Sequence, residues 1–305
     1  MSVRVQHHPY DHPYVAGLPR SSLPLGVWDV GALVEAGVRI VHLHFGFETR
    51  TVDEMDRWID VLRADGIRLV HTVHDVDNPH LVDQTNHHAL LNLLAARADR
   101  LLTLSHTAAD AVDEMTGRRP IVIAHQHVVP LASMLGSRRR TRSGVYVHAA
   151  TCRPNLDVDL IERVAAGARA WGGLRVYVRT PLSPHGRQVA RRLDAHPDIA
   201  VELGRRPSDR ELWRRIAASR AVLLAYRWST HSGLLHAAHD LAVPVLAPDV
   251  GALLEHGAWP VDVDDVEGSV GRAVVARPVS GIARRAREHH TVARAHRALY
   301  AGLVA

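Results

Sequence analysis

The feature that most constrains this chain is an alternation of short apolar runs with segments of helical period. It begins near Arg39, stops at a polar, arginine-rich stretch over 136–143, and restarts near Val145. Apolar runs separated by amphipathic helices are typical of parallel sheets with crossover helices. The restart therefore predicts two successive α/β units joined by a linker.

The same pattern places the individual elements. In the first unit we expect strands at 40–45, 69–74, 101–104 and 121–124, and helices near 52–64, 88–98 and 108–115. In the second unit we expect strands at 145–149, 174–179, 199–203, 221–226 and 244–247, and helices near 156–171, 186–195, 209–218 and 232–241.

Chain length agrees with this division, because 305 residues suit two domains of roughly 150 residues each. We predict an N-terminal Rossmann-like domain over 1–137 and a C-terminal Rossmann-like domain over 144–281. The basic segment 282–305 has helical period and no strand after it, so we expect it to pack back on the first domain. The fold class is a tandem α/β pair.

Composition excludes several classes of protein. Hydrophobic residues make up 47% and charged residues 23%, as in globular domains. Cys152 is the single cysteine, which excludes an intramolecular disulfide and a cysteine-based zinc site. No export signal and no membrane-spanning apolar run is visible, so we expect a soluble cytoplasmic protein with at most peripheral membrane contact.

The charge favours small anionic partners. The chain has a net charge of +5 and a pI near 9.9, and it contains no lysine, so all 37 basic residues are arginine. The planar guanidinium fork suits phosphate groups. The 32 acidic residues are spread along the chain, and we therefore expect no nucleic-acid partner.

Polar clusters follow the strands predicted in the first unit. They occupy 42–48, 71–80 and 125–127, and each stands at the end of a strand. Ligands of parallel sheets bind at the carboxyl ends of the strands. These clusters are therefore candidate binding residues.

The second unit has a strand, a polar loop and a helix start in 226–241. Ser229 or Thr230 is placed to cap that helix, and Gly233 allows close backbone approach. The N–H groups of a helix start and its dipole form an anion site. Arg153 and Asn155 follow the first strand of this unit at the same edge, so Arg153 is placed to clamp the same anion.

Taken together, these stretches resemble the retaining glycosyltransferases of family 4, which have the GT-B fold. The similarity lies in 42–48, in 72–80 and in the stretch from Thr230 to Asp249, and it points to a compact actinobacterial branch. The resemblance implies two Rossmann-like domains facing each other across a cleft. It also implies a nucleotide sugar held by the C-terminal domain, an acceptor pocket shaped by the N-terminal domain, and no cofactor or metal.

The resemblance also assigns roles. His74 and Asp75 match the His-Asp pair after the second strand of the alternation, so His74 is expected to face the transferred sugar as a catalytic residue, with Asp75 orienting the loop or ring. The expected donor-binding residues are Arg153, Asn155, Arg227, Thr230, His231, Ser232, Gly233 and His236. The expected acceptor-side residues are His12, Tyr14, His44, Gly46, Glu48, Asn78 and His80.

Two departures from the family pattern bear on the donor. A phosphate-binding lysine is absent, and Arg179 or Arg227 are its candidate substitutes. A pair of glutamates eight positions apart is also missing, since Trp228 and His236 stand near its positions. His236, or Asp240 one turn later on the same helix face, is then the candidate for ribose hydroxyls.

Several of these motifs also have a purely structural interpretation. His42 with His44, and His125 with His127, lie at period two, which suits either a metal pair or hydrogen-bonded packing. Segment 7–14 is either an acceptor loop or a frayed terminus, and 78–80 is either a ligand set or a rigid turn. The arginines of 138–140 and 284–285 are expected on the solvated surface, with anionic lipid as the alternative.

The sequence thus predicts an EC 2.4 type enzyme that moves a sugar, with retention, from a nucleotide donor to an unidentified acceptor. That acceptor is a natural product, a glycan or a lipid. The alternatives are a catalytically silent sugar or nucleotide-binding protein, a nucleotide-sugar epimerase, and a histidine-based metalloenzyme.

Overall fold

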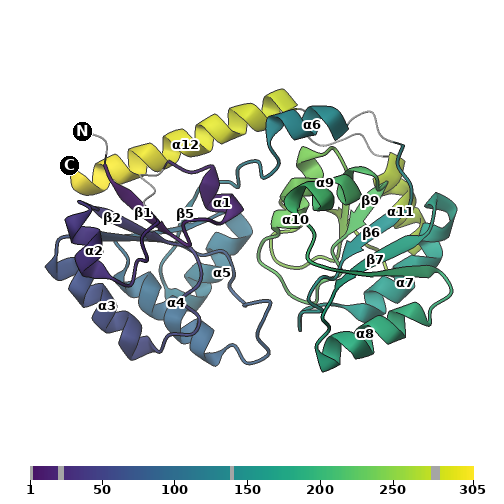
Figure 1. Cartoon of the computed structure of the whole chain (residues 1–305), viewed down its shortest axis with the longest axis horizontal. Helices are drawn as coiled ribbons and strands as arrows, with labels where there is room; N and C mark the ends of the chain where they lie inside the picture. The colour runs from purple at the N-terminus through teal and green to yellow at the C-terminus, as the bar shows by residue number, and fades with distance from the viewer. Residues whose placement is uncertain (1–2, 20–23, 138–140, 276–281) are drawn as a thin grey trace. The chain divides into compact units, whose positions relative to one another are not determined.

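The computed structural model describes residues 3–19, 24–137, 141–275 and 282–305. The chain divides into two compact units, Met1–Gln126 with Arg287–Ala305 and His127–Ala286. Each unit contains one parallel sheet with helices on its faces (Figure 1). The boundary between the units precedes the arginine-rich stretch, of which 138–140 lies outside the described residues.

The first unit has five strands, arranged in sequence order β1-β2-β3-β4-β5. They are β1 (Val5–His8), β2 (Ile40–Leu43), β3 (Arg68–Thr72), β4 (Arg100–Thr103) and β5 (Ile121–Val122). Its helices are α1 (Pro13–Ala16), α2 (Val30–Glu35), α3 (Val52–Ala64), α4 (Thr85–Arg97), α5 (His106–Thr116) and most of α12 (Ile282–Val304).

The two faces of this sheet are covered differently. Right-handed crossovers between neighbouring parallel strands bring α2 to α5 to one face, where Val41 and Leu43 enter the core (Figure 1). The other face is covered by α1 and α12, and Tyr300 of α12 packs there. Side chains alternate along a strand, so His42 and His44 lie on the α12 face.

The second unit has a six-stranded sheet in the order β11-β10-β9-β6-β7-β8. Its strands are β6 (Val145–His148), β7 (Leu174–Arg179), β8 (Ile199–Gly204), β9 (Ala221–Leu223), β10 (Val245–Ala247) and β11 (Trp259–Pro260). Its helices are α6 (Leu131–Ser137), α7 (Val158–Ala168), α8 (Pro184–Asp194), α9 (Asp209–Ala217), α10 (Gly233–Asp240) and α11 (Val266–Val275), with the short 3-10 helix η1 (Arg169–Trp171) after α7.

This second sheet is doubly wound. Residues of α7 and α11 pack on one face, and residues of α9 and α10 pack on the other. From β6 the chain first proceeds outward to β7 and β8, and then returns to place β9 on the other side of β6. The strand order therefore reverses between β6 and β9, and such a switch point is where doubly wound sheets bind ligands.

Most predicted elements are present, and α3 has the predicted bounds because Thr51 and Glu54 form a capping box at its start. Short elements such as β1, α1, α2, β11 and α6 carry too little periodic signal and were not predicted. Segment 7–14 contains the end of β1, at His8, and the start of α1, in which Tyr14 lies.

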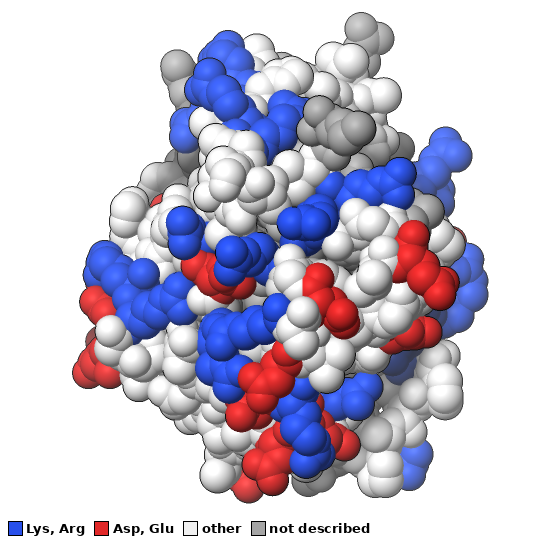
Figure 2. Space-filling view, turned by 90° about the vertical axis from the view of Figure 1, so that its left-hand side faces the viewer, with Lys and Arg blue, Asp and Glu red and all other residues white. Residues whose placement is uncertain are grey.

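Basic side chains on the first unit's face seen in Figure 2 lie next to acidic ones over much of its lower half. Ion pairs in this unit join Arg97 to Asp56 and Asp60, and Arg68 to Asp99. Much of the arginine charge here is therefore balanced locally. Among the described helices, none combines the length and the apolarity that crossing a membrane requires.

Candidate functional site

The switch point of the second unit joins two loops that the sequence had singled out separately. The Asn155 side-chain amide donates to the carbonyl of Trp228 (2.9 Å), and the Arg227 N–H donates to the carbonyl of Asn155 (2.7 Å). An isolated bridge pairs Leu156 with Tyr226. The loops after β6 and β9 therefore form one surface.

Helix α10 starts at this surface without a side-chain cap. Its N-cap is Ser232, so the expected cap by Ser229 or Thr230 is wrong. The Ser232 side chain bonds to Tyr226 instead, and the Ser229 hydroxyl donates to a carbonyl two residues on (3.1 Å). Gly233 is exposed, and a β-carbon there would meet open space. N–H groups of the first turn are thus left for water or a ligand.

Two of the predicted arginines stand in different surroundings. Arg153 is exposed, and within the described residues it forms no ion pair with a carboxylate. Arg227 lies against the carboxylates of Asp157 (4.0 Å) and Asp159 (3.5 Å), which neutralise part of its charge. Arg153 is therefore the better placed of the two to receive an anion.

Two buried polar atoms at the switch point have no protein partner. Among the described residues, Asn155 Oδ1 and Trp228 Nε1 accept and donate no hydrogen bond. Buried polar groups of native proteins are almost always bonded to protein or water. Their position in the tied loops points to a polar ligand or to ordered water.

His148, at the end of β6, is a site residue that the sequence reasoning missed. Its Nδ1 lies 2.9 Å from the Tyr146 hydroxyl, and its ring stacks on Tyr177 at 5.5 Å. Burial, followed by nearby arginines of which Arg153 is the strongest, lowers the pKa of His148 to about 4. The residue is therefore neutral at pH 7. Its position directly before the 150–155 loop was the available signal.

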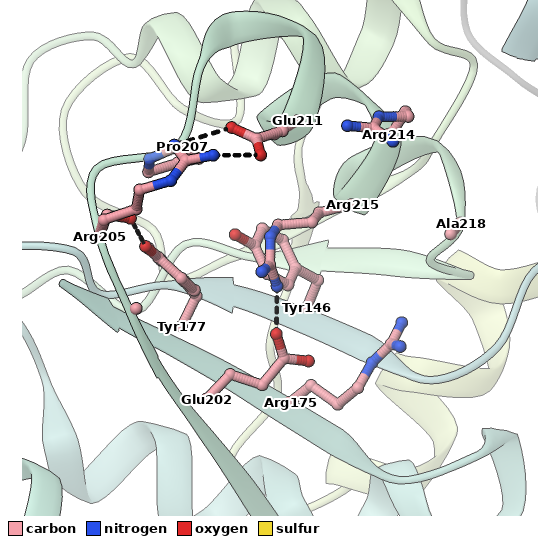
Figure 3. A pocket seen from close by; sticks show the side chains of 11 residues that line it. Tyr146, Arg175, Tyr177, Glu202, Arg205, Pro207, Glu211, Arg214, Arg215 and Ala218 are labelled. Carbon is pink, nitrogen blue, oxygen red and sulfur yellow. Dashed lines mark hydrogen bonds and ion pairs between the residues drawn. The ribbon is translucent and has the colours of Figure 1, made fainter.

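A groove of about 490 Å³ opens on the α9 face of the same sheet, along β7 and β8 (Figure 3). Both of its carboxylates are paired, Glu202 with Arg215 and Glu211 with Arg205 (2.7 Å). The Arg215 guanidinium also covers the ring of Tyr177 at 4.7 Å. Ion pairs thus fill much of the groove lining.

Asp240 does not serve the role expected from its helix position. One carboxylate oxygen accepts from the N–H groups of Val128 (2.7 Å) and Val129 (2.9 Å), and the other accepts from Arg285 Nε (2.6 Å). Burial raises the pKa of Asp240, against the opposing effects of Arg285 and the two amides. The proposed ribose contact is therefore wrong for Asp240. Arg285 is buried in this pair, so its expected place on the solvated surface is also wrong.

His231 and His236 lie beside the α10 start and pack on a third histidine. His236 is buried, and its ring lies 4.9 Å from the ring of His256. The ring of His231 lies 5.4 Å from the same His256 ring. Burial lowers the pKa of His256. Both predicted donor residues are therefore close to the switch-point loops, and His236 is enclosed there.

The first unit brings several of its predicted residues into a histidine cluster. His7 Nε2 lies 3.1 Å from the carbonyl of Pro19, and His7 Nδ1 lies 2.9 Å from His44 Nε2. His44 Nδ1 lies 3.1 Å from His74 Nε2. The three rings therefore form a hydrogen-bonded chain that begins at a backbone carbonyl and ends at the predicted catalytic histidine.

His42 stacks on this chain at 4.1 Å from His44, and its nitrogens lie 2.7 Å from the Tyr300 hydroxyl and 2.7 Å from the Thr72 hydroxyl. Ligand atoms of His7, His42 and His44 lie within 4.8 Å of one another, close enough to consider a metal ion. All six of their ring nitrogens already have hydrogen-bond partners. A cation would have to replace a hydrogen bond at every nitrogen it bound.

Burial sets the charge of the cluster. Burial, and then the neighbouring histidines, lower the pKa values of His42 and His44 well below their usual range. Burial also lowers the pKa of His71 to about 4. These imidazoles are therefore neutral at pH 7.

Acceptor-side residues predicted in the first unit fall into two groups. Tyr14 is buried with its ring 4.7 Å from His74, and His12 caps α1 through Nδ1. Asn78 instead shapes a turn, since its Oδ1 accepts from the N–H of His80 (2.9 Å). Gly46 adopts a φ of 86° in the loop after β2, an exposed position where a β-carbon would strike His8.

Asp75 and Glu48 lie at the border of this region. Asp75 is half-buried, and its carbonyl lies 3.1 Å from His87 Nε2. Glu48 is also half-buried, and its charge opposes the lowering of the His8 pKa by burial.

Comparison with known proteins gives a likeness in structure alone. No family model matches the sequence, and no curated protein is similar to it. Sucrose-phosphate synthase of Thermosynechococcus elongatus superimposes with a TM-score of 0.61 at 14% identity, over 90% of this chain and 76% of that one. A UDP-forming trehalose-phosphate synthase of Burkholderia xenovorans, in complex with glucose-6-phosphate, gives 0.60 at 12% identity, over 98% and 79%.

TarM gives a TM-score of 0.55 at 10% identity, and this chain spans half the length of TarM. Identities this low establish the fold and nothing finer. The chain has the GT-B fold, with two Rossmann-like α/β domains.

Proposed function

We propose that this protein is a glycosyltransferase that moves a sugar from a nucleoside-diphosphate donor to an acceptor, with retention of anomeric configuration. The observation that carries the proposal is the switch point of the second unit. Arg153, which forms no ion pair among the described residues, stands there with the start of α10, which has no side-chain cap, and with two buried polar atoms that have no hydrogen-bond partner in the described part of the chain. The printed names of the structural neighbours, which include sucrose-phosphate and trehalose-phosphate synthases, support the same class.

The chemistry follows from charge. Cleavage of the sugar–phosphate bond leaves negative charge on the diphosphate, and fixed donors stabilise that charge in the transition state. Arg153 supplies a cation and the first turn of α10 supplies N–H groups and a dipole. No metal is needed for this role. The resemblance to family 4 supplies the stereochemistry, with front-face substitution assisted by the leaving phosphate.

Thermal shift with UDP, GDP and ADP sugars tests the donor. A donor at 100 times its Kd should stabilise the protein by about 2.7 kcal/mol. Arg153→Ala should weaken donor binding by about 10-fold to 100-fold, because a charge-assisted hydrogen bond contributes roughly 1.5–3 kcal/mol. Arg163→Ala, which removes an exposed arginine of α7, is the matched control. No shift with any nucleotide would exclude the proposal.

Product analysis separates the alternatives. Release of nucleoside diphosphate with a retained anomer in the product supports the transferase, and loss of that release in folded Arg153→Ala assigns it to this site. Conversion of the donor to another sugar without nucleotide release identifies an epimerase. Binding without turnover identifies a silent binding protein.

A further inference from the structure

The groove on the α9 face of the second unit exists because β8 carries little side-chain volume there. Side chains alternate along a strand, so Ala200, Glu202 and Gly204 of β8 share this face. A β-carbon on Gly204 would lie 3.2 Å from the ring of Tyr177. Strand β8 is also the last strand of its sheet, so no further strand lies beside it. The sheet edge therefore has room for a ligand.

The groove lining carries more positive than negative charge. Four arginines and two glutamates face it, which leaves a net charge of +2: Arg175, Arg205, Arg214, Arg215, Glu202 and Glu211. Both glutamates are paired, each with one arginine. Arg175 and Arg214 have no carboxylate partner within the described residues, and no dashed line reaches either of them in Figure 3. A cleft lined by an excess of one charge concentrates ions of the other.

Arg175 and Arg214 also keep N–H groups for an occupant. Arg175 Nη2 donates to the carbonyl of Ser143 (3.1 Å), and Arg214 Nε donates to the carbonyl of Arg210 (3.4 Å). Within the described part of the chain, Nη1 of Arg175 and both terminal nitrogens of Arg214 form no hydrogen bond. Planar guanidinium groups with open N–H donors suit the oxygens of a phosphate group.

These two arginines stand away from the switch point of the same sheet. Arg175 is the second residue of β7, and Arg214 lies in the second half of α9, which returns toward the amino ends of the strands. The switch-point loops instead follow the carboxyl ends of β6 and β9. The basic end of the groove is therefore a different place from the candidate donor site.

Glu202 adds a hydrogen-bond acceptor. Its Oε2 is paired with Arg215, whereas its Oε1 accepts no hydrogen bond from the described residues and faces the groove (Figure 3). Glu211 is occupied, because it accepts from Arg205 (2.7 Å) and from the N–H of Ser208 (2.8 Å). The groove volume of about 490 Å³ exceeds the needs of one phosphate ion and falls within the roughly 300–1,000 Å³ of small-molecule sites. A phosphate that carries hydroxyl groups fits this lining.

We propose that this groove binds a phosphate monoester of a small hydroxylated compound, with the phosphate on Arg175 and Arg214 and a hydroxyl group on Glu202. The site lies within the second unit and does not depend on the proposed function. Tyr146 and Tyr177 line the groove, and the same two side chains contact His148 at the end of β6. The groove and the switch point are therefore joined by two shared aromatic side chains.

Calorimetric titration of the full chain tests the ligand class. Glucose 6-phosphate, inorganic phosphate and glucose are compared at one ionic strength. Glucose 6-phosphate should bind about 10-fold more tightly than inorganic phosphate, because a hydrogen bond to a charged group has that effect on Kd. Glucose should not bind measurably. Absence of binding by both phosphate compounds, or equal binding of glucose and glucose 6-phosphate, would overturn the proposal.

Arginine variants locate the bound phosphate. Arg214→Ala and Arg175→Ala should each weaken binding of glucose 6-phosphate by about 10-fold or more. Arg191→Ala is the matched control, because Arg191 is also exposed on a helix and its Nε also donates to a carbonyl four residues before it (3.3 Å). Arg214 is exposed, so its removal leaves the fold intact. Unchanged affinity in both groove variants would overturn the proposal.

Glu202→Ala tests the hydroxyl contact through a change of preference. The substitution removes the acceptor and releases Arg215, so inorganic phosphate should bind more tightly while the preference for glucose 6-phosphate falls toward one. Glu162→Ala, which removes a carboxylate paired with Arg192 elsewhere in the unit, should leave the preference unchanged. An undiminished preference in Glu202→Ala would overturn the role of Glu202.

Arg153→Ala separates this site from the donor site. It should leave binding of glucose 6-phosphate unchanged, and Arg214→Ala should leave nucleotide binding unchanged. If no nucleotide binds but glucose 6-phosphate depends on Arg214, the proposed function is wrong and the groove site stands. If glucose 6-phosphate depends on Arg153 and not on Arg214, the ester occupies the switch point and the groove proposal is wrong.

Discussion

The two units place polar groups on their sheets in opposite ways. In the first unit, histidines of β1 and β2 lie under α12 and bond to one another, with all six ring nitrogens of His7, His42 and His44 partnered. In the second unit, the switch point leaves Arg153 exposed and α10 uncapped. The three histidines have partners within their own unit, whereas the switch point holds polar groups that are open to a ligand.

Sheet winding explains the difference. Sequential strand order sends α2 to α5 to one face and leaves the other to α1 and α12, so that inward-facing histidines are enclosed. The reversal of order between β6 and β9 parts the connections at the carboxyl edge, so that loop residues there remain open. The enclosed Asp240 departs from this arrangement in the second unit and provides the strongest test.

Asp240→Asn should have the largest effect on stability. The substitution removes the carboxylate charge that faces the buried Arg285, and breaking a buried pair typically costs about 3–5 kcal/mol. Urea unfolding, monitored by hydrogen exchange of backbone amides in the second unit, measures the loss in the free energy of unfolding. Asp110→Asn, which removes a 65% exposed partner of Arg119, should change the free energy of unfolding by less than about 1 kcal/mol. Equal effects would contradict the enclosed role of Asp240.

Gly251→Ala should displace the loop that contains Ser229 and Thr230, to which we assign donor binding. Gly251 has a φ of 52°, and a β-carbon there would lie 1.8 Å from the carbonyl oxygen of Ser229. The loop must move, with a loss of about 2–4 kcal/mol in stability and weaker nucleotide binding. Gly117→Ala is the control, since its φ is 68° but its β-carbon meets open space. Nucleotide affinity should be unchanged in that control.

Acidification should act on the switch point through His148. Its folded pKa of about 4 lies below the usual value near 6.5, so the unfolded state takes up the proton first. The stabilisation is complete above pH 6.5 and is lost as pH falls toward 4, with a loss of about 2 kcal/mol after allowance for partial exposure. Urea unfolding at pH 7 and at pH 4.5 should show a smaller decrease for His148→Phe than for wild type. An identical decrease would remove His148 from the acid response.

Local signals predicted much of this architecture, whereas contacts distant in sequence were not predictable. The alternation gave both sheets, and the Thr51 capping box gave the bounds of α3. The loops that carry Arg153 and 230–233 were correctly placed at one sheet edge because parallel strands end together. Asp240 was misread because its partner, Arg285, stands 45 positions away and no local pattern announces it.

The histidine chain shows the same limit. Period two placed His42 and His44 on one face, but their partner His7 lies on β1, a strand too short to be predicted. Similarly, the cap of α10 depends on how the 226–232 loop folds back on Asn155, which leaves Ser232 at the N-cap and occupies its side chain with Tyr226. Residue types indicated which polar interactions were available, and tertiary contacts determined which atoms form them.

The smallest predicted effect concerns how helices end in the two units. In the first unit α5 ends at Gly117, with a φ of 68°, and in the second unit Ala242 adopts a φ of 55° after α10. An L-residue pays roughly 1–2 kcal/mol for this conformation, and glycine adds chain entropy to the unfolded state. Ala242→Gly should therefore stabilise the protein by about 0.5–1 kcal/mol.

Urea unfolding midpoints of Ala242→Gly and of two comparison variants test this prediction. Gly117→Ala should lower stability by about 1 kcal/mol, because it introduces the strain that Ala242 already bears. Ala166→Gly, at an exposed position inside α7, should also lower stability by about 1 kcal/mol, because glycine is unfavourable within a helix. If glycine raises stability at position 242 and lowers it at position 166, the local backbone conformation determines the sign of the stability change. A loss at both positions would mean that Ala242 is held without strain, with its carbonyl bonded to Arg142 at 2.6 Å.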